Sequence, residues 1–339
     1  MLDTLETLCC LDGVTGGEDE VRNYILERVM PFADEIRTDP LGNLMIFKIG
    51  AVTPDKRIML CAHMDEVGLI VTDITDDGYL RFDMAGGLDR RVLIGKRVYV
   101  GTERIMGIVG AKAYHLTTAE QRKSIPQIKD MYIDIGAASR GEAEQAVQVG
   151  ALAAFDDSVV RFGDGFIKAK AIDDRVGCAT MVELLESQLP CDCWFAFTVQ
   201  EELGCRGAVA ATQNIQPDVA LILEGTTAAD LPGVEGANQV CKLGGGIVIP
   251  FMDKRTIYDR ELYRTLGRLA NENGIPWQTK TKIAGGTDAS VVQRSGKGVR
   301  VAALSVAMRN IHSPACVAKI DECEAQYKLA KLFLKEMAE

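Results

Sequence analysis

The chain has 339 residues, of which 47% are hydrophobic and 25% are charged, and its formal net charge at pH 7 is −10. This length is sufficient for two domains. The negative charge, together with the lack of a basic run interleaved with aromatic residues, argues against nucleic acid as the main partner. No uninterrupted run of about 18 apolar residues occurs, so we expect no membrane span.

The amino-terminal residues and the cysteines together predict a cytoplasmic location. The opening sequence, MLDTLETLCCLDG, is acidic and lacks the basic segment and the apolar core of a secretory signal. The ten cysteines include no CxxC pair, so a zinc knuckle is not indicated. In a cytoplasmic protein these cysteines are most simply reduced thiols.

The first 66 residues predict one helix and two strands. Apolar residues recur at helical spacing across residues 18–29, which indicates an amphipathic helix. Residues 41–50 are typical of a strand bounded by glycines, and residues 57–68 contain an apolar run that ends at His63.

From about residue 67 to residue 164 the pattern is different. Short β-rich segments alternate there with turn signals such as Asp-Asp-Gly at 76–78 and Ala-Gly-Gly at 85–87. Five or more short strands at this spacing predict a small barrel or sandwich.

After Ala171 strands and helices alternate. We expect strands at 193–199, 218–224 and 299–306, and helices at 173–189, from 207, at 260–274 and from about 322. Continuous apolar strands that alternate with helices indicate a mostly parallel sheet covered on both faces. We therefore predict an α/β fold: a doubly wound catalytic domain of residues 1–66 and 165–339, interrupted by an inserted β domain of residues 67–164.

Metal-capable side chains stand at five strand ends or adjoining loops, where open α/β sheets collect their reactive groups. They are His63, Asp173, Glu202, Glu224 and His312. Two imidazoles and three carboxylates suit zinc, cobalt or manganese better than calcium.

Each of these residues also has a purely structural interpretation. A single histidine beside a strand is usually a hydrogen-bonded structural residue, Asp173 and Asp174 could cap a helix, and Glu201 and Glu202 could lie in a solvated loop. The occurrence of all five at one predicted sheet edge, with two of the chain's three histidines among them, favours a metal site.

Several segments of the chain resemble the M42 metallo-aminopeptidase family. They are AHMDEVG at 62–68, IDDRVG at 172–177, QEELG at 200–204, GGTDAS at 285–290 and NIHSP at 310–314. The resemblance runs nearly end to end, and the ordered combination of the first three motifs is highly specific. It implies a PDZ-like inserted domain that mediates dimerisation, and a homo-oligomer in which dimers assemble into a dodecamer.

The resemblance also implies roles for individual residues. His63, Asp173 and Glu224 would hold one divalent metal ion, and Glu202 and His312 a second, with Asp173 as the bridge. Glu201 would be the general base, and Asp65 would orient the imidazole of His63. Elementary chemistry agrees, because two metal ions activate a water for attack and a nearby carboxylate can move its proton. The substrates implied are short peptides, cleaved at their N-terminal residue.

One position departs from the family pattern and leaves the specificity open. Many of these enzymes have aspartate where this chain has Glu224. A related two-metal carboxypeptidase or acyl-amino-acid hydrolase therefore stays an alternative. A glucanase is less favoured, because sugar subsites favour stacking aromatics, and only 6% of the residues are aromatic, with Trp194 and Trp277 as the only tryptophans. A scaffold without catalysis is disfavoured by the chemically competent ligand set.

Three further residues have less certain roles. Asp288, in the segment 285–290, could contact the free α-amine of a substrate, or the segment could be a simple loop. Arg309 could bind peptide carbonyls or brace the loop before His312. His115 lies in the inserted domain and is most simply structural or part of a subunit contact.

Overall fold

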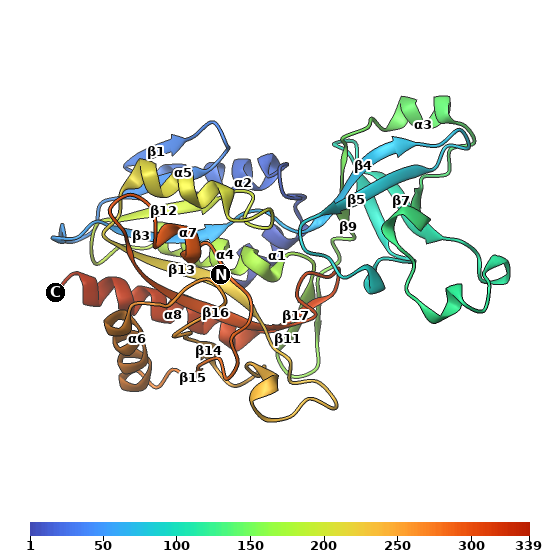
Figure 1. The fold of residues 1–339 in the computed structure, drawn as a ribbon. Helices are drawn as coiled ribbons and strands as arrows, with labels where there is room; N and C mark the ends of the chain where they lie inside the picture. Colours follow the sequence, from blue (N-terminus) through green and yellow to red (C-terminus); the bar gives the residue numbers. More distant parts are fainter.

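The computed structural model describes residues 1–339 as a large α/β body and a smaller β-barrel beside it (Figure 1). The chain enters the barrel directly after strand β3 and returns to the large body after strand β9. The barrel is therefore an insertion in the α/β body, as predicted.

The α/β body is built on one 11-stranded sheet. Nine strands form its main path, in the order β1 (Glu35–Thr38), β2 (Leu44–Lys48), β12 (Cys193–Thr198), β3 (Ile58–His63), β13 (Val219–Thr227), β16 (Arg300–Arg309), β17 (Cys316–Lys319), β11 (Phe166–Ala169) and β10 (Val160–Phe162). Two short strands, β14 (Ile247–Val248) and β15 (Trp277–Gln278), extend it beside β16.

The centre of this sheet is parallel. β12, β3, β13 and β16 pair in parallel, whereas the strands on both sides of them pair antiparallel. Every residue of β3 and β12 is buried, which explains why these strands appear in the sequence as continuous apolar runs without alternation. The predicted doubly wound, mostly parallel sheet is confirmed.

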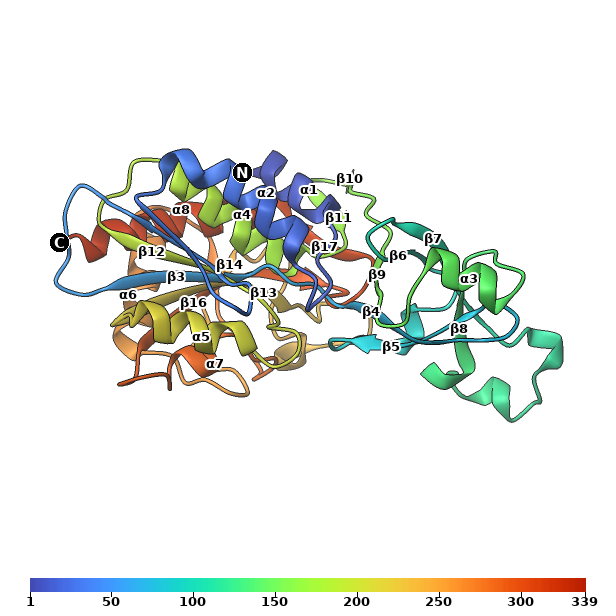
Figure 2. The same cartoon turned by 90° about the horizontal axis from the view of Figure 1, so that it is seen from above.

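Helices cover both faces of the sheet. Figure 2 shows α1, α2 and α4 on one side and α5 and α7 on the other. The bounds of the helices are α1 (Leu2–Cys10), α2 (Asp19–Val29), α3 (Arg140–Ala146), α4 (Ile172–Glu186), α5 (Arg206–Ile215), α6 (Arg260–Glu272), α7 (Ala289–Val292) and α8 (Ile320–Met337). Short 3₁₀ turns lie at Met30–Phe32, Arg90–Val92, Tyr114–Leu116, Gln121–Lys123, Ile128–Asp130 and Gly236–Gln239. None of the helices combines the length and apolar character needed to cross a lipid bilayer.

The inserted domain is a closed barrel with its own core. Its strands follow the order β4 (Gly68–Ile74), β5 (Leu80–Ala85), β8 (Met131–Asp134), β7 (Ile105–Ala111), β6 (Arg97–Val100) and β9 (Leu152–Phe155). β9 closes the barrel by pairing with both β4 and β6. The sequence left a barrel and a sandwich open, and this closure decides for the barrel.

The boundary of the inserted domain at residue 164 remains a proposal. β10 lies before that residue, yet it pairs with β11 in the large sheet. The strand pairing therefore favours a boundary between the end of β9 at Phe155 and the start of β10 at Val160.

Candidate metal centre

His63 is the last residue of β3, and its side chain is buried at the carboxyl end of the parallel strands. Its Nδ1 lies 3.0 Å from the carbonyl oxygen of Asp65. Its Nε2 lies 3.2 Å from Oε1 of Glu224 and 3.6 Å from Oδ1 of Asp173. An Nδ1–H that donates to the Asp65 carbonyl leaves the Nε2 lone pair directed at the carboxylates, the arrangement of a metal-binding histidine.

Asp173 lies between the two histidines at the start of α4. Its Oδ1 faces His63, and its Oδ2 lies 3.5 Å from Nε2 of His312. Oδ1 is buried and has no hydrogen-bond partner, which is costly for a carboxylate oxygen unless a cation binds it. Gly225 makes room for this oxygen, because a Cβ at that position would lie only 2.8 Å from it.

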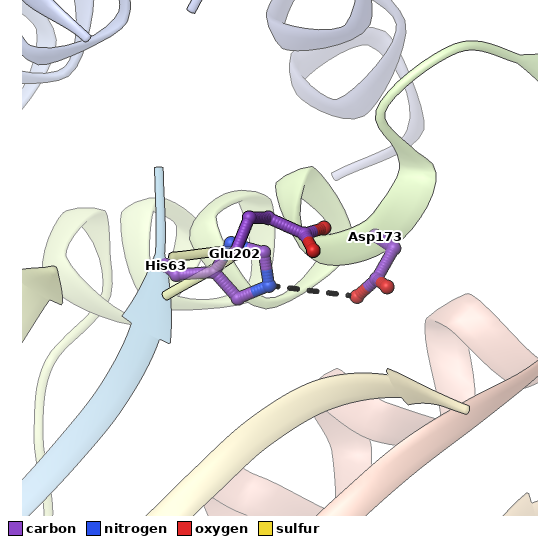
Figure 3. Close-up of side chains that lie close together, drawn as sticks. All are labelled: His63, Asp173 and Glu202. Carbon is purple, nitrogen blue, oxygen red and sulfur yellow. Dashed lines mark ion pairs between the residues drawn. The ribbon is translucent and has the colours of Figure 1, made fainter. Parts of the chain in front are cut away.

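His312 and Glu202 complete the cluster from two loops. Nε2 of His312 lies 3.4 Å from Oε1 of Glu202, and its Nδ1 lies 2.9 Å from the carbonyl oxygen of Gly87 in the inserted domain. Figure 3 shows Glu202 beside His63 and Asp173, with the His63–Asp173 pair marked. Both histidines thus point Nε2 at the carboxylates while a carbonyl engages Nδ1.

The separations within the cluster fit shared cations better than direct hydrogen bonds. The four nitrogen–oxygen distances are 3.2, 3.4, 3.5 and 3.6 Å, long for charge-assisted hydrogen bonds. Two ligands that each lie about 2.0 Å from a tetrahedral ion are about 3.3 Å apart. A cavity of about 10 Å³ beside Asp173, Glu202 and His312 is close to the space that one water molecule needs. The residues present therefore fit divalent metal ions.

The pKa values of the buried carboxyl groups in the cluster also indicate a site for divalent metal ions. Burial raises the pKa of Glu202 to about 8, and it raises the pKa of Glu224 well above its ordinary value. Burial opposes ionisation of Asp173 too, but the neighbouring imidazoles of His312 and His63 hold its pKa below the usual range. So many buried carboxylates are stable only with protons or cations among them.

Glu201 faces a different environment from Glu202, as expected for adjacent residues. The thiol of Cys205 lies 3.2 Å from Oε1 of Glu201 and donates to it. Burial raises the pKa of Glu201 to about 7, with a further contribution from the charge of Asp288. A carboxyl group that titrates near neutrality is suited to accept and return a proton.

Asp65 acts through two sets of atoms. Its carbonyl engages His63, whereas its two carboxylate oxygens each accept a hydrogen bond of 3.0 Å, from the backbone N–H of Glu201 and of Glu202. The nearest carboxylate oxygen is 3.4 Å from Nδ1 of His63. The sequence predicts that Asp65 orients the imidazole of His63. In the structure the Asp65 side chain also fixes the backbone of the loop that carries Glu201 and Glu202.

The two residues predicted to bind substrate differ in their surroundings. Asp288 is buried near Glu201 and accepts a hydrogen bond of 2.7 Å from the hydroxyl of Thr198. Arg309 makes two hydrogen bonds to the carboxylate of Asp230, at 2.8 and 2.6 Å. Its guanidinium is thus already engaged, which favours the bracing role over contact with a peptide.

Sequence reasoning did not find three contributors to the site. Asp174 lies near His63 and Glu224, but its oxygens accept the backbone N–H groups of His63 and Gly177, so it positions the strand end. The Asp-Asp pair signalled a helix start and not this bond. The carbonyl of Gly87 had no signal in the sequence, because it lies 225 residues from His312. Cys205 is only four residues after Glu201, but its sequence position alone did not indicate a thiol bond to the carboxylate.

An α/β sheet whose carboxyl edge carries a mixed imidazole and carboxylate cluster defines the architecture of a metallohydrolase. Comparison with known proteins gives the family. The sequence model of the M42 glutamyl aminopeptidase family matches residues 42–329, and the chain belongs to this family. Its members are aminopeptidases, hydrolases that act on peptide bonds, and the chain is such an enzyme.

Similar proteins span the whole chain. A protein of Acetivibrio thermocellus with an aminopeptidase name is 39% identical over 331 residues, 97% of each chain. The lysyl aminopeptidase of Pyrococcus furiosus is 32% identical and covers 96% of this chain and 94% of its own. Among solved structures, aminopeptidase APDkam598 of Desulfurococcus kamchatkensis has a TM-score of 0.93 at 34% identity, with 98% and 94% of the two chains covered. The TET1 peptidase of Pyrococcus horikoshii, which assembles into a tetrahedron or an octahedral shell, has a TM-score of 0.86 at 34% identity, with 99% of each chain covered.

Proposed function

We propose that the protein is a two-metal aminopeptidase that removes N-terminal residues from short peptides. His63, Asp173 and Glu224 would hold one ion, and Asp173, Glu202 and His312 the other. The observation that carries this assignment is the position of Asp173, whose two oxygens face the Nε2 atoms of two different histidines. Zinc, cobalt or manganese suits this donor set.

The ions, when bound, polarise the scissile carbonyl and lower the pKa of the attacking water. Glu201 accepts the proton of that water and delivers it to the departing amine, a step that general-base catalysis accelerates by about 10²–10⁴-fold. The Cys205 thiol donates a hydrogen bond to the Glu201 carboxylate and so helps to fix its position. Asp65 keeps the backbone of both glutamates fixed, so that their side chains diverge.

Asp288 is the proposed contact for the α-amine of the substrate. Its Oδ1 is buried and has no hydrogen-bond partner, whereas Thr198 occupies the other oxygen. An ammonium group is the natural partner for such an oxygen. A free amine would then be required for productive binding, which is the property that separates an aminopeptidase from a deacylase or a carboxypeptidase.

The test compares wild-type protein and Glu201→Gln on aminoacyl anilides, N-acetylated anilides and peptides with blocked amines, loaded in turn with zinc, cobalt and manganese. We expect hydrolysis of the free-amine substrates only, loss of that activity in Glu201→Gln, and unchanged metal content by elemental analysis. Glu235→Gln, an exposed glutamate, is the matched control. Cleavage of the acetylated substrates would favour the deacylase, and an active Glu201→Gln would refute the base.

We further propose a cytoplasmic homo-oligomer in which dimers assemble into a dodecamer. The similar TET1 peptidase forms closed shells, and the inserted domain exposes large apolar side chains. These include Met106, Tyr114 and Leu116, which are 56%, 74% and 58% exposed. All ten cysteines are free, which is consistent with a reducing compartment. Sedimentation velocity at micromolar concentration tests the assembly, and a monomer would contradict it.

A further inference from the structure

One turn of the inserted barrel lies directly on part of the metal cluster. Gly86 and Gly87 follow β5, and the carbonyl oxygen of Gly87 lies 2.9 Å from Nδ1 of His312. A Cβ added at Gly87 would lie 3.4 Å from the same nitrogen. A Cβ added at Gly86 would lie 3.2 Å from the Cβ of Glu202. The backbone of this turn therefore contacts both residues that are assigned to the second ion alone.

The turn needs glycine in order to approach so closely. Gly86 has a φ of +92°, a conformation that other L residues rarely adopt. A Cβ there would also lie 2.9 Å from Cγ1 of Val67, too close for a normal contact. The Ala-Gly-Gly segment at 85–87 is thus more than a turn signal, since it brings a backbone carbonyl of the barrel to a metal ligand.

The two histidines of the cluster receive this kind of support from different domains. Nδ1 of His63 lies 3.0 Å from the carbonyl oxygen of Asp65, only two residues further along the chain. Nδ1 of His312 faces a carbonyl 225 residues away, in the barrel. The side chain of His63 is 1% exposed and that of His312 is 37% exposed. His312 is held less by packing, so its orientation depends more on this hydrogen bond.

Arg104 ties the barrel to the α/β body. It lies in the turn between β6 and β7, and its guanidinium donates to the carboxylate of Asp12, which follows α1 in the body. It also donates at 2.7 Å to Asp157, in the segment that returns from the barrel to the body. Its guanidinium lies 4.4 Å from the ring centroid of Tyr99, another barrel residue. These contacts fix the arginine on the barrel and direct its charge at the body.

The ion pairs continue inside the body. The ammonium of Lys170 lies 3.0 Å from Asp12 and 2.7 Å from Glu66, and the lysine is 1% exposed. Glu66 lies in the segment that leads from β3 into the barrel. Both connections between the domains are therefore held by one chain of ion pairs. Within it Arg104 can be removed without leaving a buried charge unpaired, because Asp12 keeps Lys170 as a partner.

We propose that the Gly86–Gly87 turn is a positioning element of the second metal site and that Arg104 keeps the barrel docked so that the turn reaches His312. The inference rests on the proposed two-metal centre. Loss of the Arg104 ion pairs lets the barrel shift, which withdraws the turn from His312. The second ion is then bound more weakly, whereas the first ion, whose histidine is supported within its own segment, is retained.

The experiment titrates chelator-treated protein with cobalt in a calorimeter and counts the ions by elemental analysis. We expect two ions per chain in wild type. Arg104→Met should bind the first with unchanged affinity and the second at least about tenfold more weakly, as for loss of a support outside the ligand set. Arg104→Lys, which can still pair with one carboxylate, should recover part of that affinity. Arg140→Met is the matched control and should keep both ions, because Asp73, Asp76 and Glu144, the partners of Arg140, all lie in the inserted domain.

A second pair of variants tests the turn itself. Gly86→Ala should weaken the second ion selectively, because the added methyl group displaces the turn from Glu202. Gly136→Ala is its control: Gly136 is a barrel glycine with a φ of +79° and no atom within 4 Å of an added Cβ, so it should lose stability but keep both ions.

The outcomes separate the inference from the function beneath it. Unchanged affinity for the second ion in both Arg104→Met and Gly86→Ala would overturn the positioning role. An equal weakening of both ions would also overturn it, because that result indicates general destabilisation. A wild-type protein that binds fewer than two ions would refute the two-metal centre itself, and the inference with it.

Discussion

The two edges of the central sheet differ in a way that locates the chemistry. At the amino ends of the strands lies the larger hollow, a cleft of about 940 Å³, whereas the cavity among the histidines and carboxylates at the other edge holds only about 10 Å³. In the large cleft Lys297 lies 2.7 Å from Asp218, and Arg57 donates to the carbonyl of Ile215. At the opposite edge Asp173 and Asp288 each have an oxygen without a partner.

Between these two edges, buried aspartate oxygens without a partner occur at the edge with the metal cluster, and the larger cavity lies at the other. A buried polar atom without a partner costs free energy, and the unpartnered oxygen of Asp173, which faces the imidazole of His63, therefore favours a bound cation. No residue of the large cleft belongs to the metal cluster, so substitutions there should leave turnover unchanged.

Asp173→Asn should produce the largest loss of activity among these substitutions. A small loss would contradict the assignment of the chemistry to this edge of the sheet. The change removes negative charge from the residue between His63 and His312, so both of the proposed ions would lose a carboxylate ligand. We expect activity to fall by at least about 10³-fold, since metal activation and positioning are lost together. Anilide turnover and elemental analysis check this. Retention of both activity and full metal content would contradict the bridging assignment.

Chelation should expose a pH dependence that the metal-loaded protein lacks. In the metal-free state the pKa of Glu202 is raised from 4.5 to about 8 by burial. Although burial opposes it, the neighbouring carboxylates of Asp173 and Glu202 raise the pKa of His312 from 6.5 to about 9. The folded state then binds more protons than the unfolded state, so stability falls as the pH rises from about 5 to 9.

Thermal melts across this pH range, with and without a chelator, test the sign. Added metal should raise the melting temperature most at high pH, because the ions replace the missing protons. If the metal-free protein became more stable between pH 5 and pH 9, the pKa values of Glu202 and His312 would not be raised in the folded state.

Cys205→Ala should have an intermediate effect. Its thiol donates to Glu201, so the change frees the base carboxylate without touching a ligand. We expect kcat to fall by about tenfold, the equivalent of one hydrogen bond, with KM and metal content unchanged. Cys205→Ser keeps a donor and should recover part of kcat. Cys193→Ala, at a buried cysteine distant from the site, is the control. An equal loss of kcat in this variant would contradict a specific role of the Cys205 thiol in positioning Glu201.

Lys297→Ala, in the large cleft, should have the smallest effect. The lysine is 75% exposed, and its pair with Asp218 is worth less than about 1 kcal/mol. Activity and metal content should match wild type, with a melting temperature shifted by only a few degrees at most. A clear loss of turnover would mean that the amino edge of the sheet contributes to the function.

The sequence by itself determined the fold class and the chemical composition of the centre. Apolar strands that alternate with helices require a parallel sheet, and parallel strands bring their carboxyl ends to one edge, so His63 and Glu224 were expected to meet. Glu201 and Glu202 were also expected to diverge, since neighbouring side chains point in different directions.

Only the tertiary structure decided which atoms face one another. Lys280 and Lys282 are two residues apart in the sequence TKTK, yet Lys280 is buried and donates to the carbonyl of Ala284, whereas Lys282 is exposed and donates to Asn238. The carbonyl of Gly87, which engages His312, comes from a different body of the molecule. Helix and strand patterns are local, whereas the partner of a buried polar atom depends on long-range packing, and this is why the ligand types could be predicted but their supports could not.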